Sequence, residues 1–276
     1  MNDEGFIKEL LYNKQNVMQH FPDKQVAHFF IDELFSFLFV SPVDGLSITG
    51  ELEKYQELKN IFSSLLSKLI SDEATVRRKT AAFFSALSNI YKTLLRDAAF
   101  LLESDPAAKS LSEVIIAYPG FYATTVYRLS HHLWQQELFT LARLFCEYAH
   151  SKTGIDIHPA ATIGSAFAID HGTGVVIGET TIIGNNVKVY QGVTLGALNV
   201  NKNNASTKRH PTIENDVVIY SGATILGGET IIGSGSIIGG NVWLTHSVPA
   251  NSVVYHKSEV KVKDKNPFPE PLNFII

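Results

Sequence analysis

The chain has 276 residues, of which 45% are hydrophobic, and its formal net charge at pH 7 is −4. This length is enough for one or two domains with a substantial core, and the charge excludes the basic field that non-specific nucleic-acid binding needs. The acidic N-terminus lacks the apolar stretch of a secretory signal, and no run approaches the roughly 20 apolar residues of a membrane span. The single cysteine, Cys146, cannot form an internal disulfide and is interpreted as a packed thiol. We therefore expect a cytoplasmic protein with no membrane or nucleic-acid partner.

The first part of the chain has the period of helices, with apolar residues recurring at three- and four-residue spacings. The segments with this pattern are 7–21, 26–39, 55–70 and 75–103. Asp105 and Pro106 come next. Because Asp is a favoured N-cap and Pro is tolerated at the first helical position, we expect a new helix to begin there.

Residues 118–150 then indicate a turn and one or two further helices. His131 and His132 lie inside this pattern and are interpreted as a pair on a helix face rather than a metal site. The sequence predicts a helical domain over residues 1–152.

From about residue 155 the period changes to six. The aliphatic residues that carry it are Ile157, Ile163, Ile169, Ile177, Ile183, Val189, Leu195, Ile213, Ile219, Ile225, Ile232, Ile238 and Leu244. Neither a helix nor a simple strand has this period, whereas a solenoid with a short strand and a turn every six residues does. Three such units close a triangular coil, and coils stack at about 4.8 Å. We predict a solenoid domain over residues 153–256 and a tail over 257–276.

The register of the repeat is interrupted at three places. A slip of two residues follows His171, in the stretch AIDHGTG, where an Asp-His pair has no packing reason to stand. A polar excursion follows Leu195 and closes at Arg209 and His210, and a single extra residue, interpreted as a bulge, precedes Ile232. Polar excursions from a rigid scaffold are common places for binding residues.

The repeat resembles the left-handed β-helix of the hexapeptide acyltransferases, and the motifs within it resemble the serine O-acetyltransferase family. These motifs are DIHPAATIG (156–164), IDHGTGVVIGET (169–180), VTLGA (193–197) and KRHPTI (208–213), with DPA (105–107) and GFYATTVYRLSHHLW (120–134) in the helical part. The resemblance covers about residues 90–255. It implies an α+β fold, in which an N-terminal all-helical domain is followed by a C-terminal left-handed parallel β-helix of hexapeptide repeats.

The resemblance also implies an activity: acetyl transfer from acetyl-CoA to L-serine, the first step of cysteine biosynthesis, by a homotrimer or a hexamer. It assigns His171 as the general base and Asp156 as the carboxylate that orients it. An imidazole suits the role because it titrates near neutral pH and can return the proton to the departing thiolate. Asp156 and His171 are fifteen residues apart, which permits contact on adjacent coils. From periodicity alone, two polar residues at solvated corners are the alternative.

The resemblance places the L-serine zwitterion between charged side chains. Arg209 suits the carboxylate because its planar fork can bond both oxygens, and His210 adds a donor. Asp170 and Asp105 suit the ammonium. The alternatives are an ordinary Arg-His pair in a loop and, for Asp105, a helix N-cap.

For acetyl-CoA the expected donors are mostly backbone N–H groups, the first ones after Leu195 being the candidates for the oxyanion hole. The resemblance places the pantetheine along Gly196, Ala197, Ser221, Gly239 and Gly240. The phosphates are expected near Lys257, Lys261, Lys263 or Lys265, although a solvated lysine run is the alternative. His158 is expected to make a structural hydrogen bond, and no metal is expected.

Three other functions remain open from the sequence. A zinc enzyme resembling γ-class carbonic anhydrase would use His158, His171 and His210, but the chain lacks the closely spaced ligand pair of those enzymes. Another hexapeptide acyltransferase would take an amino sugar or homoserine, which the Arg-His and Asp residues favour less than an amino acid such as serine. A purely structural spacer gives no reason for those residues at the register breaks.

The tail ends in Ile276. In the resembled family a terminal isoleucine can insert into O-acetylserine sulfhydrylase, so this enzyme is a predicted partner.

Overall fold

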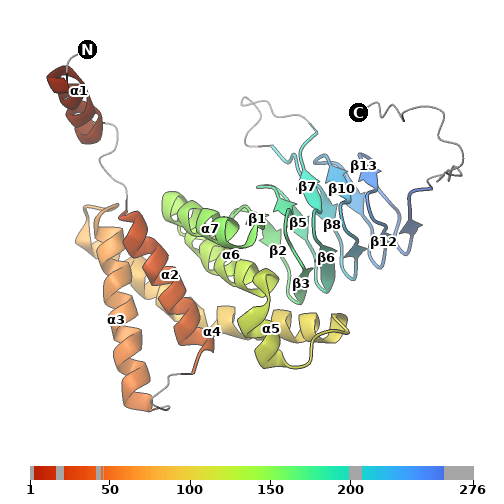
Figure 1. Ribbon diagram of the computed structural model, residues 1–276, viewed down its shortest axis with the longest axis horizontal. Helices are drawn as coiled ribbons and strands as arrows, with labels where there is room; N and C mark the ends of the chain where they lie inside the picture. The colour runs from red at the N-terminus through yellow and green to blue at the C-terminus, as the bar shows by residue number, and fades with distance from the viewer. Residues whose placement is uncertain (1–2, 17–21, 42–44, 46, 199–206, 258–276) are drawn as a thin grey trace, which may run out of the picture.

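The computed structural model describes residues 3–16, 22–41, 45, 47–198 and 207–257, in which helices precede a parallel β-solenoid (Figure 1). The helices are α1 (Asp3–Asn16), α2 (Lys24–Phe39), α3 (Ile48–Ser67), α4 (Glu73–Ser104), α5 (Leu111–Ala117), α6 (Pro119–Gln135) and α7 (Phe139–Thr153). None of these helices combines the length and the apolar character that a bilayer crossing requires.

Several helices begin at a residue whose side chain accepts a free backbone N–H. Asp23, Ser47, Asp72 and Ser110 do so for α2, α3, α4 and α5 respectively, which explains why these helices begin where they do. The last helix, α7, ends at Gly154, whose φ of 71° is a left-handed conformation that glycine adopts at little cost. The chain turns there into the first strand.

The expected N-cap at Asp105 is wrong, because Asp105 is instead the C-cap of α4. Its backbone N–H donates to Leu101 O, and its carboxylate accepts the backbone N–H of Ala107 at 2.9 Å, two residues on. This local bond makes a turn rather than a helix, and α5 begins only after Ser110. The carboxylate of Asp105 is thereby held at the end of α4, beside the solenoid.

The helical core is largely aromatic. Phe30 packs against Phe62, Phe83 and Phe145, with ring centroids 5.2–6.3 Å apart, and all four side chains are fully buried. These rings join α2, α3, α4 and α7 into one unit. The first helix, α1, has no buried residue and stands apart from the others in Figure 1.

The solenoid consists of short parallel strands that form three sheets around a triangular core. Sheet A contains β1 (Asp156–Ile157), β4 (Val176–Ile177), β7 (Thr194–Gly196), β10 (Thr224–Leu226) and β13 (Trp243–Leu244). Sheet B contains β2 (Thr162–Ile163), β5 (Ile182–Ile183), β8 (Thr212–Ile213) and β11 (Ile231–Ile232). Sheet C contains β3 (Phe167–Asp170), β6 (Val187–Tyr190), β9 (Val218–Ile219), β12 (Ile237–Ile238) and β14 (Val253–Val254).

The predicted six-residue repeat is confirmed. Every one of its aliphatic residues lies in a strand, and all are buried except Leu244, which is partly buried and packs against the same core. Equivalent residues of successive coils pair directly, as Ile157 does with Ile177 and Ile177 with Leu195. The fold is the expected helical part followed by a left-handed β-helix of about five turns.

Two edges of this prism are important for the site. The turns from sheet C to sheet A, which we call the histidine edge, are residues 171–175, 191–193, 220–223 and 239–242. The turns from sheet A to sheet B, which we call the arginine edge, are residues 158–161, 178–181, 197–198 with 207–211, and 227–230.

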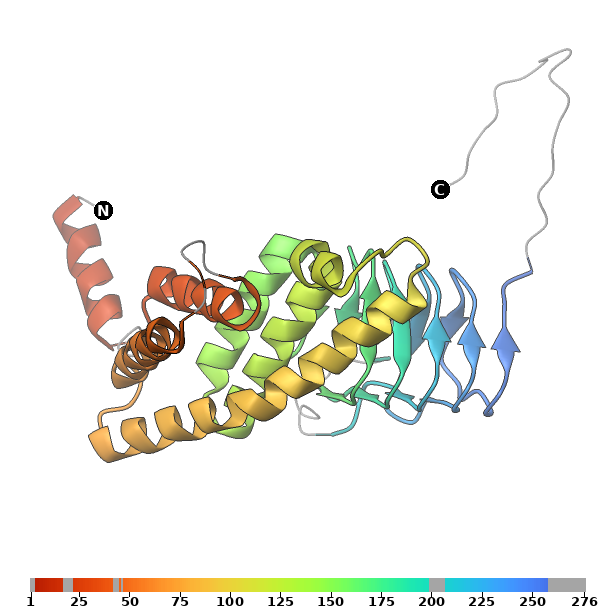
Figure 2. The ribbon, with the colours of Figure 1, turned by 90° about the horizontal axis from the view of Figure 1, so that it is seen from below.

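The helical part covers the first strands of the solenoid, and α4 reaches β3 (Figure 2). Gly120 of α6 lies so close to β3 that a Cβ atom there would be 2.1 Å from Ile169 O. Asp97 and Arg128 form a buried ion pair, in which Arg128 Nε donates to Asp97 at 2.5 Å. Asp97 also accepts the backbone N–H of Phe167 at 3.0 Å. This pair fixes the strand that ends at Asp170.

Candidate active site

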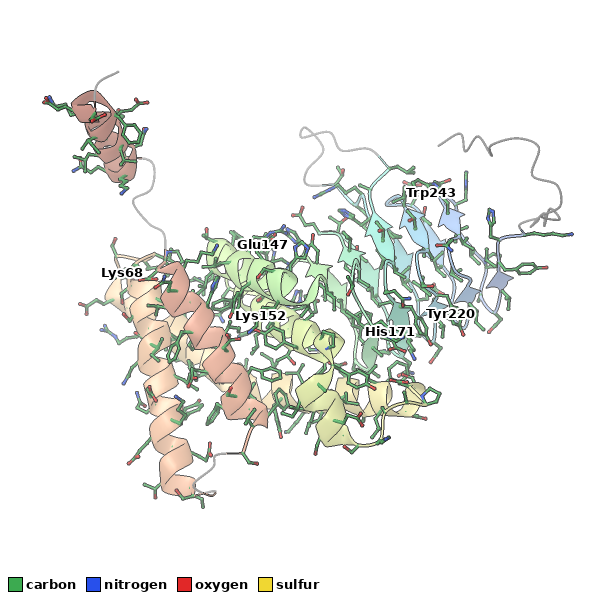
Figure 3. The ribbon with its side chains drawn as sticks, in the orientation of Figure 1. Lys68, Glu147, Lys152, His171, Tyr220 and Trp243 are labelled. Atoms are coloured by element: carbon green, nitrogen blue, oxygen red, sulfur yellow. The ribbon has the colours of Figure 1, made fainter. Side chains whose placement is uncertain are left out.

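The two-residue slip in the repeat places His171 on an outward bulge of the histidine edge. His171 has a φ of 59°, and Gly172 and Gly174 also have positive φ, so the turn after β3 swings away from the prism. The His171 side chain is 71% exposed, and Figure 3 shows it on the same side of the solenoid as Tyr220.

Two predicted acceptor residues lie beside His171. Asp170 is buried, and its Oδ1 is 3.8 Å from His171 Nε2. Asp105 approaches from the helical part, where Tyr118 donates its hydroxyl to Asp105 Oδ2 at 2.7 Å. This bond, the N–H of Ala107 and the nearby charges of Lys188 and His171 hold the pKa of Asp105 below its usual value. The structure therefore brings His171, Asp170 and Asp105 together.

Arg209 and His210 lie on the arginine edge, where residues of the preceding coil hold them. Arg209 forms an ion pair with Glu179. Thr180 Oγ1 accepts the backbone N–H groups of Arg209 and His210, at 2.9 and 3.0 Å. Gly178 leaves room for the His210 ring, because a Cβ atom at this position would be 2.0 Å from His210 Cδ2.

The protonation state of His210 follows from its surroundings. Burial, followed by the charges of Arg209 and Lys208, lowers the pKa of His210 to about 4, so the ring is neutral at pH 7. Its Nδ1 accepts the backbone N–H of Thr180 at 3.1 Å, which places the remaining proton on Nε2. His210 is therefore a neutral hydrogen-bond donor.

A single chain does not bring His171 and its neighbouring carboxylates close to Arg209 and His210. Sheet A separates the histidine edge from the arginine edge. Asp156, the predicted orienting carboxylate, lies in β1 of that sheet, and its neighbour Ile157 points into the core. Within the described ranges, no hydrogen bond or ion pair joins Asp156 to His171. The catalytic and acceptor residues predicted in the solenoid thus lie on sheet A, on its two flanking edges or, for Asp170, at the end of β3, whereas Asp105 approaches from the helical part.

The predicted acetyl-CoA residues divide between the same two edges. Gly196 and Ala197 adjoin the arginine edge, whereas Ser221, Gly239 and Gly240 lie on the histidine edge. The N–H of Gly239 already donates to Val254 O at 2.7 Å, so it is not a free donor for a ligand. Lys257 follows β14 and is exposed.

Other predictions fall outside these groups. His158 Nδ1 accepts the N–H of Ala160 at 3.1 Å, which is the structural hydrogen bond expected of it. His131 Nδ1 donates to Pro159 O at 2.8 Å, and burial raises the pKa of the Cys146 thiol to about 12. In the part of the chain that the structure describes, no three His, Cys, Asp or Glu side chains are arranged to hold a metal ion.

Two expectations concern residues outside the described ranges. Ile276, with Lys261, Lys263 and Lys265, belongs to residues 258–276, and most of the polar excursion belongs to 199–206. The predicted complex with the sulfhydrylase stays a prediction.

Sequence reasoning missed four residues that support the site, namely Glu179, Thr180, Tyr118 and Lys188. The sequence did contain a signal for Glu179 and Thr180. Ile182 of one coil pairs with Thr212 of the next, so residues 179 and 180 stack beneath residues 209 and 210 when the inserted excursion is left out of the count. Tyr118 acts through a contact within the helical part, and Lys188 acts through a contact between the solenoid and the helical part. The repeat carries no signal for either contact.

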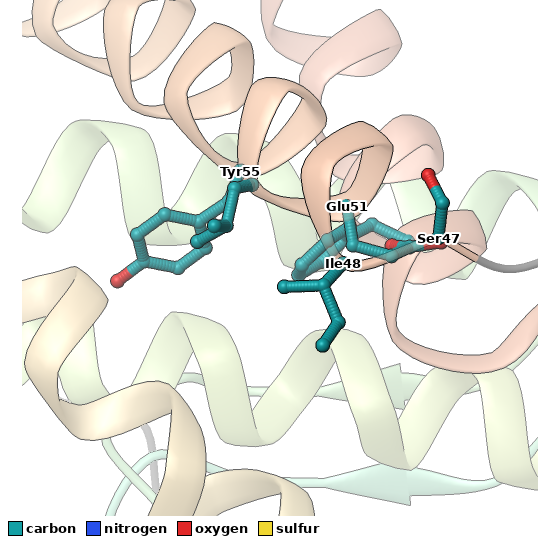
Figure 4. Close-up of a pocket in the computed structure, with 6 residues that line it drawn as sticks. Ser47, Ile48, Glu51 and Tyr55 are labelled. Carbon is teal, nitrogen blue, oxygen red and sulfur yellow. The ribbon is translucent and has the colours of Figure 1, made fainter.

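Hollows in the helical part lie apart from this site, whereas another adjoins the arginine edge. A cavity of about 450 Å³ lies between α2 and α3, with a mainly apolar lining that includes Ile48 and Tyr55 (Figure 4). A second, of about 750 Å³, lies at α7 and is lined by Trp134, Phe139 and His158. A third, of about 340 Å³, adjoins the arginine edge at Glu179, Thr180 and Lys208.

Known proteins share much of this sequence. No protein-family model matches the chain. A plasmid-encoded serine acetyltransferase of Synechococcus elongatus is 52% identical over 192 residues, which cover 68% of this chain and 59% of that protein. Serine acetyltransferase of Bacillus subtilis is 48% identical over 59% of this chain and 73% of its own length, and that of Helicobacter pylori is 43% identical over 60% and 94%. The chain belongs to the serine acetyltransferase family.

Solved structures of the family share the fold. Serine acetyltransferase 1 of Entamoeba histolytica, in complex with L-cysteine, is 37% identical with a TM-score of 0.75, covering 82% of this chain and 86% of that chain. Serine acetyltransferase of Neisseria gonorrhoeae, in complex with serine, is 25% identical with a TM-score of 0.60, covering 90% and 86%. The likeness to the Entamoeba structure includes the helical part as well as the solenoid.

Proposed function

We propose that the protein transfers the acetyl group of acetyl-CoA to the hydroxyl of L-serine, giving O-acetyl-L-serine and CoA, in the cytoplasm and as the first step of cysteine biosynthesis. The observation that supports this most is the grouping of an exposed imidazole, His171, with the carboxylates of Asp170 and Asp105. Membership of the serine acetyltransferase family gives the reaction class.

In the proposed reaction His171 is the general base. It takes the proton of the serine hydroxyl as the oxygen attacks the thioester carbonyl, and it returns that proton to the CoA sulfur when the carbon–sulfur bond breaks. An orienting carboxylate stabilises the imidazolium formed between these two steps, and Asp156 is our candidate for it.

The acceptor is held by its two charged ends. Asp105 and Asp170 receive the ammonium of serine beside His171. Arg209 receives the carboxylate, and the neutral His210 adds a donor from Nε2. Glu179 and Thr180 keep Arg209 and His210 in place, so their contribution is indirect.

We further propose that each active site is formed between two copies of the chain. The histidine edge and the arginine edge flank the same face, the outer face of sheet A. If three prisms turn this face toward a common axis, the histidine edge of each copy meets the arginine edge of the next, and the ring closes with cyclic symmetry. Asp156 lies on the face that this packing covers. A trimer is therefore the smallest active form that we expect.

This arrangement also gives acetyl-CoA a path. On the histidine edge, Ser221 lies two coils beyond His171, and Gly240 lies three coils beyond it. At the usual spacing of strands, three coils span about 14 Å. The partner's arginine edge contributes Gly196 and Ala197 from the other side. The pantetheine arm would lie in the groove between the two edges, with the phosphates toward Lys257.

The test is a comparison of acceptors. Purified protein is incubated with acetyl-CoA and L-serine, L-homoserine or glucosamine, and the loss of thioester absorbance is followed. We expect rapid turnover with L-serine and at least tenfold lower kcat/KM with the other two. Faster turnover with glucosamine or with L-homoserine would show that serine is not the preferred acceptor. No turnover with any of the three acceptors would contradict the proposal.

A further inference from the structure

Lys188 lies directly behind the two carboxylates proposed to receive the serine ammonium. It stands in β6, paired with Ala168 of β3, on the face of sheet C that the end of α4 covers. Although a lysine at such a position is normally solvated, Lys188 is only 4% exposed. Burying an ammonium group is costly unless it is paired, so its partners are informative.

The partners of Lys188 come from both domains. Its Nζ donates to the backbone carbonyl of Ser104 at 2.7 Å and lies 3.0 Å from Asp170 Oδ2. It also lies over the ring of Tyr190, 4.6 Å from the centroid. Because Lys188 takes Oδ2 of Asp170, the other oxygen, Oδ1, is the one directed at His171.

The contact with Ser104 extends this control to Asp105. Ser104 is the last residue of α4, and Asp105 is its C-cap, so the bond from Lys188 fixes the backbone that carries the second carboxylate. Burial lowers the pKa of Lys188, but hydrogen bonding with Tyr190 and Asp170 outweighs it and raises this pKa above its usual value. The group is therefore a permanent cation at neutral pH, and its charge contributes to the lowered pKa of Asp105.

We propose that Lys188 is a positioning residue for the acceptor site, which holds the carboxylates of Asp105 and Asp170 side by side and charged so that both can receive an ammonium group. This inference rests on the proposed function of the site. Without the cation, two neighbouring carboxylates repel each other and one of them takes up a proton more readily. Either change weakens the binding of serine but leaves the acetyl-CoA groove as it is.

The test compares the wild-type enzyme with Lys188→Met and Lys188→Arg. For Lys188→Met we expect the serine KM to rise about tenfold while the acetyl-CoA KM changes less than about twofold. Lys188→Arg keeps the charge, so it should recover part of the serine KM.

The matched control is Lys152→Met. Lys152 also pairs with an aspartate, Asp32 at 2.8 Å, and lies 4.8 Å from the ring centroid of Tyr148, but it belongs to the helical part away from the site. Its KM values for serine and acetyl-CoA and its kcat should match those of the wild type. If Lys188→Met does not fold, Lys188→Gln, which keeps a hydrogen-bond donor without the charge, is measured in its place with the same expectation.

The outcomes separate the inference from the function on which it rests. Wild-type protein that does not acetylate serine would contradict the proposed function. An active wild type, combined with a charge-removing variant whose serine KM is unchanged, would overturn the role of Lys188. Equal changes in both KM values would also overturn it, because they indicate a general loss of structure.

Discussion

Replacement of Asp97 by alanine should destabilise the protein strongly and disturb the active site from a distance. Asp97 is 1% exposed and accepts three hydrogen bonds: from Arg128 Nε at 2.5 Å, from Arg128 Nη2 at 2.8 Å and from the N–H of Phe167 at 3.0 Å. Without Asp97, Arg128 stays buried with only the carbonyls of Ile163 and Gly164 as partners.

The magnitude follows from this geometry. Breaking a buried ion pair by removing one partner typically costs about 3–5 kcal/mol, because the remaining charge is unpaired. This is a large fraction of the total stability of a typical domain, about 5–15 kcal/mol. Replacing both partners by apolar residues removes the unpaired charge, so the double variant Asp97→Leu/Arg128→Met should lie within about 1 kcal/mol of the wild type.

The assay is urea denaturation followed by circular dichroism, at one fixed protein concentration because the stability of an oligomer depends on it. Asp97→Ala should lower the free energy of unfolding by about 3–5 kcal/mol, and the double variant should recover most of this loss. A loss below about 1 kcal/mol would refute the reasoning, as would a double variant less stable than Asp97→Ala.

Three further predictions concern the two edges. His171→Ala should lower kcat at least about a hundredfold without changing the circular dichroism spectrum, and near-normal turnover would eliminate it as the base. Gly178→Ala should displace the ring of His210, since the new Cβ would lie 2.0 Å from it, and should raise the serine KM several-fold; an unchanged KM would contradict a role for His210 in acceptor binding. Because the pKa of His210 falls from 6.5 to about 4 on folding, the folded protein binds fewer protons than the unfolded chain in this range, and stability should decrease as the pH is lowered from 6.5 to 4. His210→Gln should reduce this decrease by about 1–3 kcal/mol in denaturation curves, and an identical slope would contradict the shift.

Much of the solenoid was predictable because its physical rule is simple and repeated. An aliphatic side chain every sixth residue fills the same place in each coil, and no other regular structure satisfies that period. The slip of two residues after His171 marked a break in the repeat, and the structure places His171 on a turn with positive φ there. Asp105 shows where local rules are ambiguous: Asp followed by Pro suits both a helix N-cap and a turn, and the turn forms here.

The arrangement of the site was less predictable, because it depends on how the helical part and the edges lie in space. Lys188 alternates with core residues along β6 like any solvated lysine, and only the end of α4 makes it buried. Likewise, a spacing of fifteen residues between Asp156 and His171 permitted contact on adjacent coils. The structure places Asp156 within sheet A and His171 on a turn that leads into this sheet, and the contact between them stays a prediction.

The central claim is that serine is acetylated between the histidine edge of one copy and the arginine edge of another. Mixing His171→Ala and Arg209→Ala subunits tests it most directly, because each variant alone lacks one half of every site. With equal amounts reassembled at random, about one quarter of the sites would combine an intact His171 with an intact Arg209, and we predict about that fraction of wild-type activity. Mixtures as inactive as the separate variants, although they form mixed oligomers, would contradict the account.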